Sequence, residues 1–296
     1  MVEQRGIKRV ILTSILALLM MAVGFVFVQE IWKSIRIEPV RGRENHYVYQ
    51  AQAFLDGKID IPLYMHDIAV YKDKYYVVYP PFPALLLLPF VAVFGLNTKS
   101  VLVGLGLCVL SIYWFCRILI KLKIEKRNIA WLAVAFFCGT GYWFSLYNSY
   151  GVCFFAHITA VAALLLSLNE ALGRGRGILV GLFLGMAFLS RQLSIYFAFF
   201  IVVSLWNNTN YSTQKDRIIN ILLFCFTLGV SVSAYLIFNW LRFDNVFDTG
   251  YSYLQLAAIS QCAVKGALFS VGANPTRQTS LRPVPPGAVQ GGNELD

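Results

Sequence analysis

The chain has 296 residues, of which 58% are hydrophobic and 14% are charged, and its mean hydropathy is +0.63. A soluble domain has about 25% charged residues, so this composition excludes an ordinary water-soluble globule. The formal net charge is +10, but the basic residues form short clusters between apolar runs, as in the cytoplasmic loops of multi-pass membrane proteins. We therefore predict an all-α polytopic membrane protein and exclude a nucleic-acid partner.

The first apolar run, over residues 10–28, follows a basic N-terminus. It has nearly the 20 or so residues that cross a bilayer, and no small-residue cleavage site closes it. We expect a retained first helix with the N-terminus in the cytoplasm. The external loop that follows, over about residues 30–99, holds nearly half of the acidic residues: Glu30, Glu38, Glu44, Asp56, Asp60, Asp67 and Asp73.

Within this loop, the stretch ENHYVYQAQAFLDG predicts a short helix. Its apolar face would consist of Tyr47, Ala51, Phe54 and Leu55, and Gly57 would end it. The next stretch, AVYKDKYYVVY, predicts a β-hairpin whose turn lies at its central Lys-Asp pair. The external loop is therefore expected to be of mixed structure.

The apolar run over residues 82–96, which begins in YPPFPALLLLPF, is too short to cross a bilayer. We predict a juxtamembrane helix along the outer membrane surface. Pro83 suits its first turn, and Pro89 is expected to kink or break it.

The basic clusters set the number of crossings, because cytoplasmic clusters must be separated by an even number of spans. They are Arg5/Lys8/Arg9, Lys121/Lys123/Lys126/Arg127, Arg174/Arg176 and Lys215/Arg217. Residues 101–120 predict one span, 129–168 predict two that meet near 147–151, and 218–240 predict the last. Residues 178–206 are long for one span and short for two. We favour a tight hairpin that crosses incompletely, with Arg191 at its outer bend, over one tilted span. The total is about seven spans.

The last residues, 259–296, break in composition from the membrane domain, which we place at 1–258. They are rich in Gly, Pro, Gln and Asn, and offer neither a span nor a periodic face. A disordered tail and an out-of-frame end are equally compatible with this composition.

Polar residues inside apolar runs are candidates for function, because charge at membrane depth is costly. His157 lies in FFAHITA and Arg191 in FLSRQLS. The alternatives are a histidine that is hydrogen-bonded between helices and an arginine that extends to the membrane surface. If instead both face an external cavity, Arg191 would pair with an anionic group such as a phosphate.

In the first loop, RGRENHY brings Arg43, Glu44 and His46 together in sequence. A carboxylate there could act as a general base, kept ionised by the neighbouring arginine. A solvated charged turn is the alternative. Asp67, beside His66 and just ahead of the hairpin, is a further candidate for substrate binding.

The order of these motifs resembles the GT-C-fold integral-membrane glycosyltransferases, including protein O-mannosyltransferases and aminoarabinose transferases. The counterparts here are RENHYVYQAQAFLDG, VYPPFPALLLLPF, SIYWFCRILIKLK and GLFLGMAFLSR, and the likeness covers about residues 10–255. It is nearest to an uncharacterised bacterial subgroup with a DG-x-x-DIP and YPP-x-PALLLLP pattern. Two departures are Arg-Glu-Asn in place of the family's usual acidic pair, and His157 in place of a second acid.

The resemblance implies a sugar transfer from a polyprenyl-phosphate donor to a lipid, glycan or protein acceptor, at the outer face of a bacterial cytoplasmic (inner) membrane. It implies that Glu44 is the catalytic residue and that Arg191 and Arg43 hold the donor phosphate. His46, His157 and Asp67 would line the substrate site or a second site. Some members use a divalent metal such as Mg²⁺ or Mn²⁺, and metal use here stays open. The alternatives are a carrier of a lipid-linked sugar and a truncated, inactive homologue.

Overall fold

The computed structural model describes residues 24–36 and 45–254, which are mostly helical. After a helix over residues 24–36 the elements are α2 (His46–Leu55), β1 (Ile68–Tyr71), β2 (Lys74–Val77), α3 (Phe82–Phe94), η2 (Gly95–Asn97), α4 (Ser100–Lys121), α5 (Lys126–Cys138), α6 (Tyr142–Tyr147), α7 (Val152–Ala171), α8 (Gly177–Phe188), η3 (Gln192–Tyr196), α9 (Phe197–Trp206) and α10 (Gln214–Phe243). The predicted helical class is confirmed.

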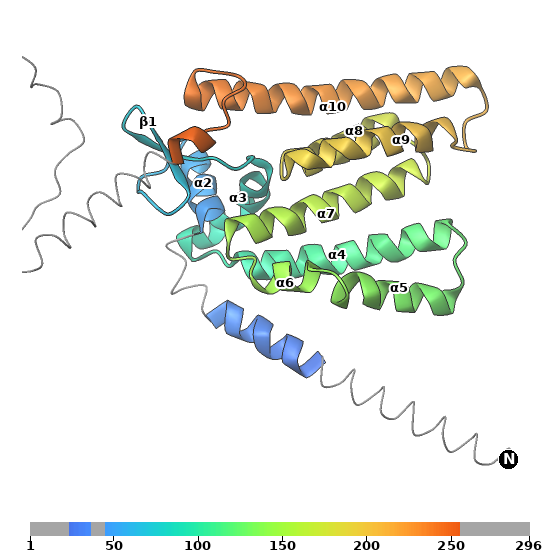
Figure 1. The fold of residues 1–296 in the computed structure, drawn as a ribbon, viewed down its shortest axis with the longest axis horizontal. Coiled ribbons are helices and arrows are strands. Elements are labelled where there is room, and N and C mark those ends of the chain that lie inside the picture. Colours follow the sequence, from blue (N-terminus) through green and yellow to red (C-terminus); the bar gives the residue numbers. More distant parts are fainter. Residues whose placement is uncertain (1–23, 37–44, 255–296) are drawn as a thin grey trace, which may run out of the picture.

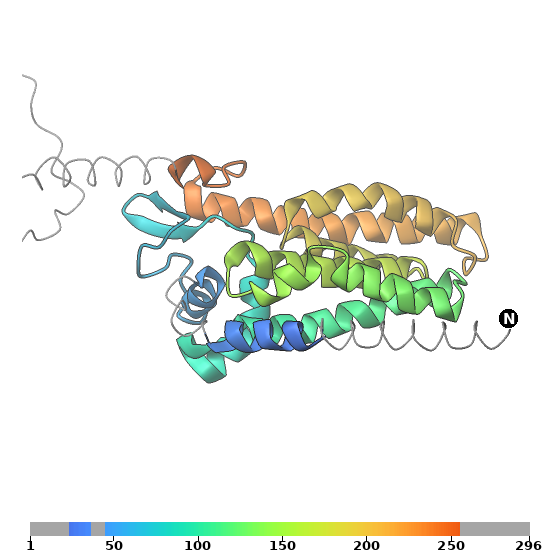
Figure 2. The same cartoon turned by 60° about the horizontal axis from the view of Figure 1, so that its bottom comes forward.

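The longer helices form an elongated bundle with a cap at one end (Figure 1). Helices α4, α5, α7, α8, α9 and α10 run side by side along the long axis, and α2, the β-hairpin and α3 gather at the capped end. Figure 2 shows the same arrangement after a turn of 60°. The first loop of the sequence is therefore folded onto one end of the bundle.

Three of the described helices are long and apolar enough to cross a membrane: α4 with 22 residues, α7 with 20 and α10 with 30. This does not support the predicted total of about seven spans. Helix α8 has 12 residues, which corresponds to about 18 Å, whereas the hydrocarbon core of a bilayer is about 30 Å thick. Helices α5 and α9 are similarly short, with 13 and 10 residues. Most of the predicted first span, 10–28, lies outside the described residues.

The two predicted helical hairpins are present in modified form. In residues 129–168 the two arms meet at 148–151 as predicted, but the first arm is split into α5 and α6 by residues 139–141. In residues 178–206, α8 runs out and η3 with α9 returns, with Arg191 at the bend. The single tilted span is thus excluded.

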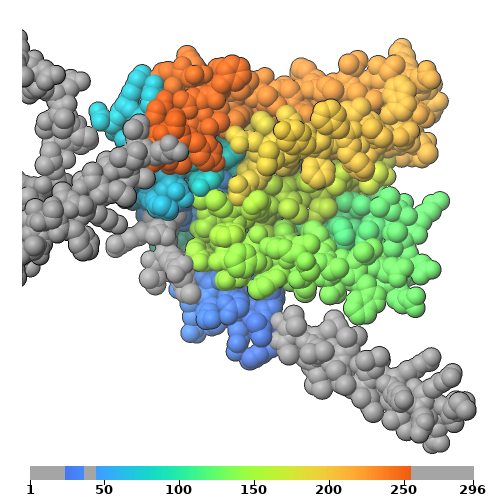
Figure 3. All heavy atoms as spheres, viewed as in Figure 1, coloured from blue at the N-terminus to red at the C-terminus, as the bar shows by residue number. Residues whose placement is uncertain are grey.

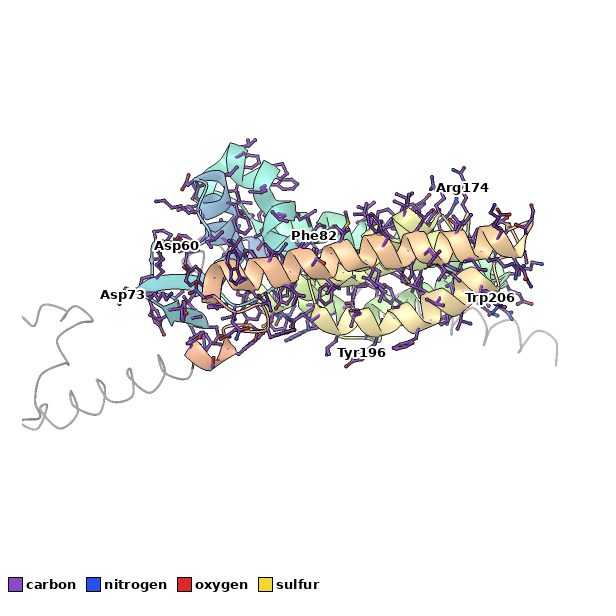
Figure 4. The ribbon with its side chains drawn as sticks, turned by 90° about the horizontal axis from the view of Figure 1, so that it is seen from above. Asp60, Asp73, Phe82, Arg174, Tyr196 and Trp206 are labelled. Atoms are coloured by element: carbon purple, nitrogen blue, oxygen red, sulfur yellow. The ribbon has the colours of Figure 1, made fainter. Side chains whose placement is uncertain are left out.

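The loops α4–α5, α7–α8 and α9–α10, which carry three of the basic clusters, lie at the end of the bundle opposite the cap (Figure 1). Figure 4 labels Arg174 and Trp206 at this end and Asp60 and Asp73 at the other. Three basic clusters and the acidic residues Asp60 and Asp73 therefore lie at opposite ends of the bundle. The first basic cluster and the tail lie outside the described residues.

The predicted juxtamembrane segment forms α3, which runs across the long axis of the bundle (Figures 1 and 2). Pro83 lies in its first turn as predicted. Pro89, in contrast, lies inside the helix without ending it, so the predicted break is wrong. The backbone N–H of Phe82 donates to the carbonyl of Leu189 at 3.0 Å. The start of α3 is therefore attached to the end of α8, beside the bend.

The predicted β-hairpin is confirmed, with β1 and β2 antiparallel and Tyr71 opposite Lys74. Its turn lies at Lys72 and Asp73, whose φ angles are +49° and +58°. Two positive φ values are the signature of a type I′ turn, which matches the twist of the strands. The cap is thus closed by a tight two-residue turn.

Helix α2 is also confirmed, and Gly57, at φ +69°, follows its end. Tyr47 and Ala51 are buried and Phe54 packs against the core, but Leu55 is exposed, so the predicted face is wrong at that position. Buried residues lie on more than one face of α2, because α3 and the hairpin pack against it from different sides.

Small residues allow α8 and α10 to pack closely. Gly177, Gly181 and Gly185 recur every fourth residue on α8, so they share one face. A side-chain carbon at any of them would collide with α10, at Asn220, at Thr227 or at Ser231 respectively. This contact fixes the hairpin that carries the bend.

The outer face of the bundle is apolar. Figure 3 shows the atoms of α9 and α10 side by side on one face, and Phe199 and Phe226 on these helices are 77% and 69% exposed. Such surfaces are unusual in soluble monomers but suit contact with lipid. The described structure is compatible with a membrane protein.

Candidate functional site

The bend between α8 and η3 positions Arg191. Its backbone N–H donates to the carbonyl of Ala187 at 2.8 Å, and one guanidinium nitrogen, Nη2, donates to the carbonyl of Cys153 at 2.6 Å. Its Nε is buried and has no hydrogen-bonding partner among the described residues. The guanidinium group of Arg191 is therefore turned towards α7. It is held against the first turn of α7 by its bond to the Cys153 carbonyl.

A cleft of about 380 Å³ lies at this bend, between α7 and the returning arm of the hairpin. Its lining includes His157, Arg191 and Gln192, and the apolar residues Leu193 and Phe197, both exposed. The predicted placement of Arg191 and His157 in one cavity agrees with this geometry. His157 lies five residues after the start of α7, which corresponds to about 8 Å along the helix axis from that end. Its ring makes no hydrogen bond to the described residues, in contrast to the alternative of an interhelical bond.

Three tyrosines gather beside the turn of α7 that holds Arg191. The Tyr79 ring lies 6.5 Å from that of Tyr47 and 6.4 Å from that of Tyr251, measured between centroids. The Tyr79 hydroxyl lies 3.5 Å from Sγ of Cys153, next to the carbonyl that holds Arg191. The aromatic cluster of Tyr47, Tyr79 and Tyr251 thus contacts the same turn of α7 as the arginine.

Burial controls the ionisation of this aromatic cluster. It raises the pKa of Tyr47 well above its ordinary value, and the positive charge of Arg191 opposes that shift in part. Burial likewise raises the pKa of Tyr251, again opposed by Arg191. Burial and the hydrogen bond with Cys153 raise the pKa of Tyr79. The cluster is therefore neutral at physiological pH, and its hydroxyl groups serve as hydrogen-bond donors and acceptors.

The predicted first-loop residues lie close to this cluster. The charge of Asp67 contributes to the raised pKa of both Tyr79 and Tyr251, and its backbone is left-handed with φ +60°. His46 is buried, and its Nε2 lies 2.5 Å from the carbonyl oxygen of His66. The cap therefore brings His46 and Asp67 to the region of Arg191, although they lie far from it in sequence.

Arg43 and Glu44 lie outside the described residues, so their predicted roles are not tested by the structure. Asn45, which follows them, is the N-cap of α2 and accepts a hydrogen bond from the N–H of Val48. Among the described residues there is no group of three His, Cys, Asp or Glu side chains that could hold a metal ion.

A buried polar network continues from the bend along α10. The side-chain amide of Gln192 donates to the hydroxyl of Tyr235. One helical turn further, Asn239 accepts from Arg242 at 2.7 Å, and Arg242 also donates to the carbonyl of Val77 in β2. The network thus connects the bend to the cap.

Sequence reasoning missed Tyr79, Tyr251, Gln192 and Arg242. Tyr79 could have been identified, because it is the tyrosine of the YPP segment and the turn before α3 directs it inward. Arg242 had a weaker signal, a charged residue at the end of an apolar run. The other two are identified only by tertiary contacts.

Comparisons of this chain with protein-family models, with curated proteins and with solved structures found no match.

Proposed function

We propose that this chain is a GT-C-type glycosyltransferase of the bacterial cytoplasmic membrane. It transfers a sugar from a polyprenyl-phosphate donor to a lipid, glycan or protein acceptor at the external face, with its N-terminus in the cytoplasm. The observation that carries the proposal is the environment of Arg191. A buried, unpaired N–H of this arginine lies beside an apolar-rimmed cleft and close to a neutral aromatic cluster.

The donor's phosphate binds at Arg191 in this proposal. Guanidinium groups bind phosphate oxygens through paired N–H groups, and burial strengthens such charge-assisted hydrogen bonds. Arg43 is the second phosphate-binding residue, as the family resemblance implies. The isoprenoid chain leaves the cleft past Leu193 and Phe197, whose exposed side chains suit contact with lipid.

The chemistry is a single displacement. Glu44 accepts the proton of the acceptor hydroxyl as its oxygen forms a bond to the anomeric carbon. The bond between that carbon and the phosphate oxygen breaks, and polyprenyl phosphate leaves with the bonding electrons. Arg191 stabilises the charge that develops on the phosphate.

The test is release of polyprenyl phosphate by membranes that contain the native chain, with a panel of labelled polyprenyl-phosphate sugars as donors. Glu44→Gln and Arg191→Ala are the variants. Arg174→Ala, at the opposite end of the bundle (Figure 4), is the matched control for general attraction of anions. We expect release by the native chain and by the control, and its loss in both variants.

Two outcomes contradict the proposal. Equal release in all four samples would remove the assignment of Glu44 and Arg191. Absence of release with every donor, from a chain shown to be folded and inserted, would exclude transfer. Transport of the intact donor by that chain would then identify the carrier that was the alternative.

A further inference from the structure

Helix α2 carries three polar side chains in an interior position. Tyr47 and Gln50 are completely buried and His46 is 5% exposed. Four of their polar atoms are buried and have no hydrogen-bonding partner among the described residues. These atoms are Nδ1 of His46, Oη of Tyr47, and Oε1 and Nε2 of Gln50. Residues 46 and 50 lie four apart and residues 47 and 50 three apart, so all three belong to one side of the helix.

Unpaired polar atoms in a protein interior are costly, and native proteins contain few of them. Here four occur within five residues, on a helix whose other buried residues include Val48, Ala51 and Ala53. Phenylalanine and leucine would fill the positions of Tyr47 and Gln50 without that cost. The arrangement is therefore better suited to binding a polar ligand than to stabilising the empty protein.

The chemistry of these atoms defines the ligand. His46 Nε2 lies 2.5 Å from the carbonyl of His66, which can only accept, so Nε2 carries the proton. In the neutral ring Nδ1 is then an acceptor. Gln50 offers one donor group and one acceptor, and the Tyr47 hydroxyl can serve as either. Tyr47 and Gln50 carry no charge, and a set of donors and acceptors of this kind complements hydroxyl groups in preference to an ammonium group or a metal ion.

The polar side of α2 lies next to the proposed phosphate site. The charge of Arg191 acts on the Tyr47 hydroxyl. The Tyr47 ring lies 6.2 Å from that of Phe155, on the same turn of α7 as Cys153, whose carbonyl holds the arginine. A ligand that reaches from Arg191 to α2 must therefore carry an anionic group and, next to it, several hydroxyl groups.

We propose that His46, Tyr47 and Gln50 bind the hydroxyl groups of the donor's sugar ring and so determine which sugar is used. This inference rests on the proposed function, because it places the donor's phosphate at Arg191.

The experiment measures binding of two probes to the full chain in nanodiscs. One probe is geranylgeranyl phosphate, and the other is the same lipid carrying mannose, glucose, galactose or arabinose. Tyr47→Phe and Gln50→Leu remove the proposed contacts. Tyr49→Phe and Gln52→Leu, on the same helix and without buried unpaired atoms, are the matched controls.

We expect Tyr47→Phe and Gln50→Leu each to weaken binding of the preferred sugar-bearing probe by about tenfold, since one hydrogen bond is lost in each. Binding of the sugar-free probe should be unchanged. Both controls should bind both probes like the native chain. Because each variant removes a costly unpaired group, its unfolding temperature should equal or exceed that of the native chain.

Three results overturn the inference. Unchanged binding of the sugar-bearing probe by both variants would remove the sugar contacts while leaving the phosphate site intact. Lower unfolding temperatures in both variants would show that these atoms have structural partners, such as enclosed water. Failure of the native chain to bind either probe would overturn the proposed function and this inference with it.

Discussion

Substitution of Gly181 by alanine is expected to disrupt the packing of α8 against α10. An added side-chain carbon would lie 2.5 Å from the carbonyl oxygen of Phe224, and Thr227 is also in its way. Ordinary contacts begin at 3.4 Å, so relief of the first collision requires 3.4 − 2.5 = 0.9 Å of movement. The obstacle is a backbone atom, and the two helices must therefore separate.

The magnitude follows from two opposing terms. Inserting a methyl group into a tightly packed contact costs about 1–3 kcal/mol. Replacing glycine by alanine in a helix returns up to about 1 kcal/mol. We expect Gly181→Ala to lower the free energy of unfolding by about 1–2 kcal/mol. We also expect weaker binding of geranylgeranyl phosphate, because α8 positions the bend that holds Arg191.

The assay is reversible unfolding of the chain in detergent or nanodiscs. The control is Gly229→Ala on α10, where an added carbon meets nothing within 4 Å. This control should be as stable as the native chain or slightly more so. If Gly181→Ala and Gly229→Ala have the same free energy of unfolding, the close packing of α8 on α10 is refuted.

Three further outcomes are expected. A hydrogen bond from Lys72 lowers the pKa of Asp244 from its ordinary 3.8, so this ion pair between the hairpin turn and the end of α10 is present above about pH 3.8 and is lost as the pH falls through the lowered pKa. Hydrogen exchange of the hairpin should therefore depend on pH in this range in the native chain and not in Asp244→Asn, and the same dependence in both would contradict the assignment. Gly57→Ala should destabilise α2 by about 1 kcal/mol because φ is +69° there, whereas Gly57→Asn should cost less, and equal unfolding temperatures would contradict this. Burial keeps Tyr47 and Tyr79 protonated, so binding of geranylgeranyl phosphate should be constant between about pH 8 and 10; a loss near pH 9 would contradict it.

Local signals in the sequence were sufficient for several elements. The Lys72–Asp73 turn, the end of α2 at Gly57 and the bend at Arg191 could all be predicted, because each depends on a short run of residues or on the placement of charge. The α3 helix was also predictable, although Pro89 was expected to kink or break it and the helix continues past it. Its ring is accommodated within a helix whose apolar side chains pack on α2 and on neighbouring parts of the cap.

The number of long spans could not be predicted in the same way. Charge placement specifies which loops share one end of the bundle, but not whether each helix between them is long enough to cross. The split of the first arm of residues 129–168 at 139–141, and the short arms of the α8–α9 hairpin, depend on packing against α4, α7 and α10. The unpaired atoms of His46, Tyr47 and Gln50 were likewise invisible, because their burial comes from contacts that are distant in sequence.

The most direct test of the proposed site is photo-crosslinking with geranylgeranyl phosphate that carries a diazirine at the first isoprene unit. The native chain and Arg174→Ala should be labelled within the segments 157–164 and 191–197, which line the cleft. Arg191→Ala should lose that labelling. Labelling of other segments in the native chain, or undiminished labelling of the cleft in Arg191→Ala, would contradict the assignment of Arg191 as the phosphate-binding residue.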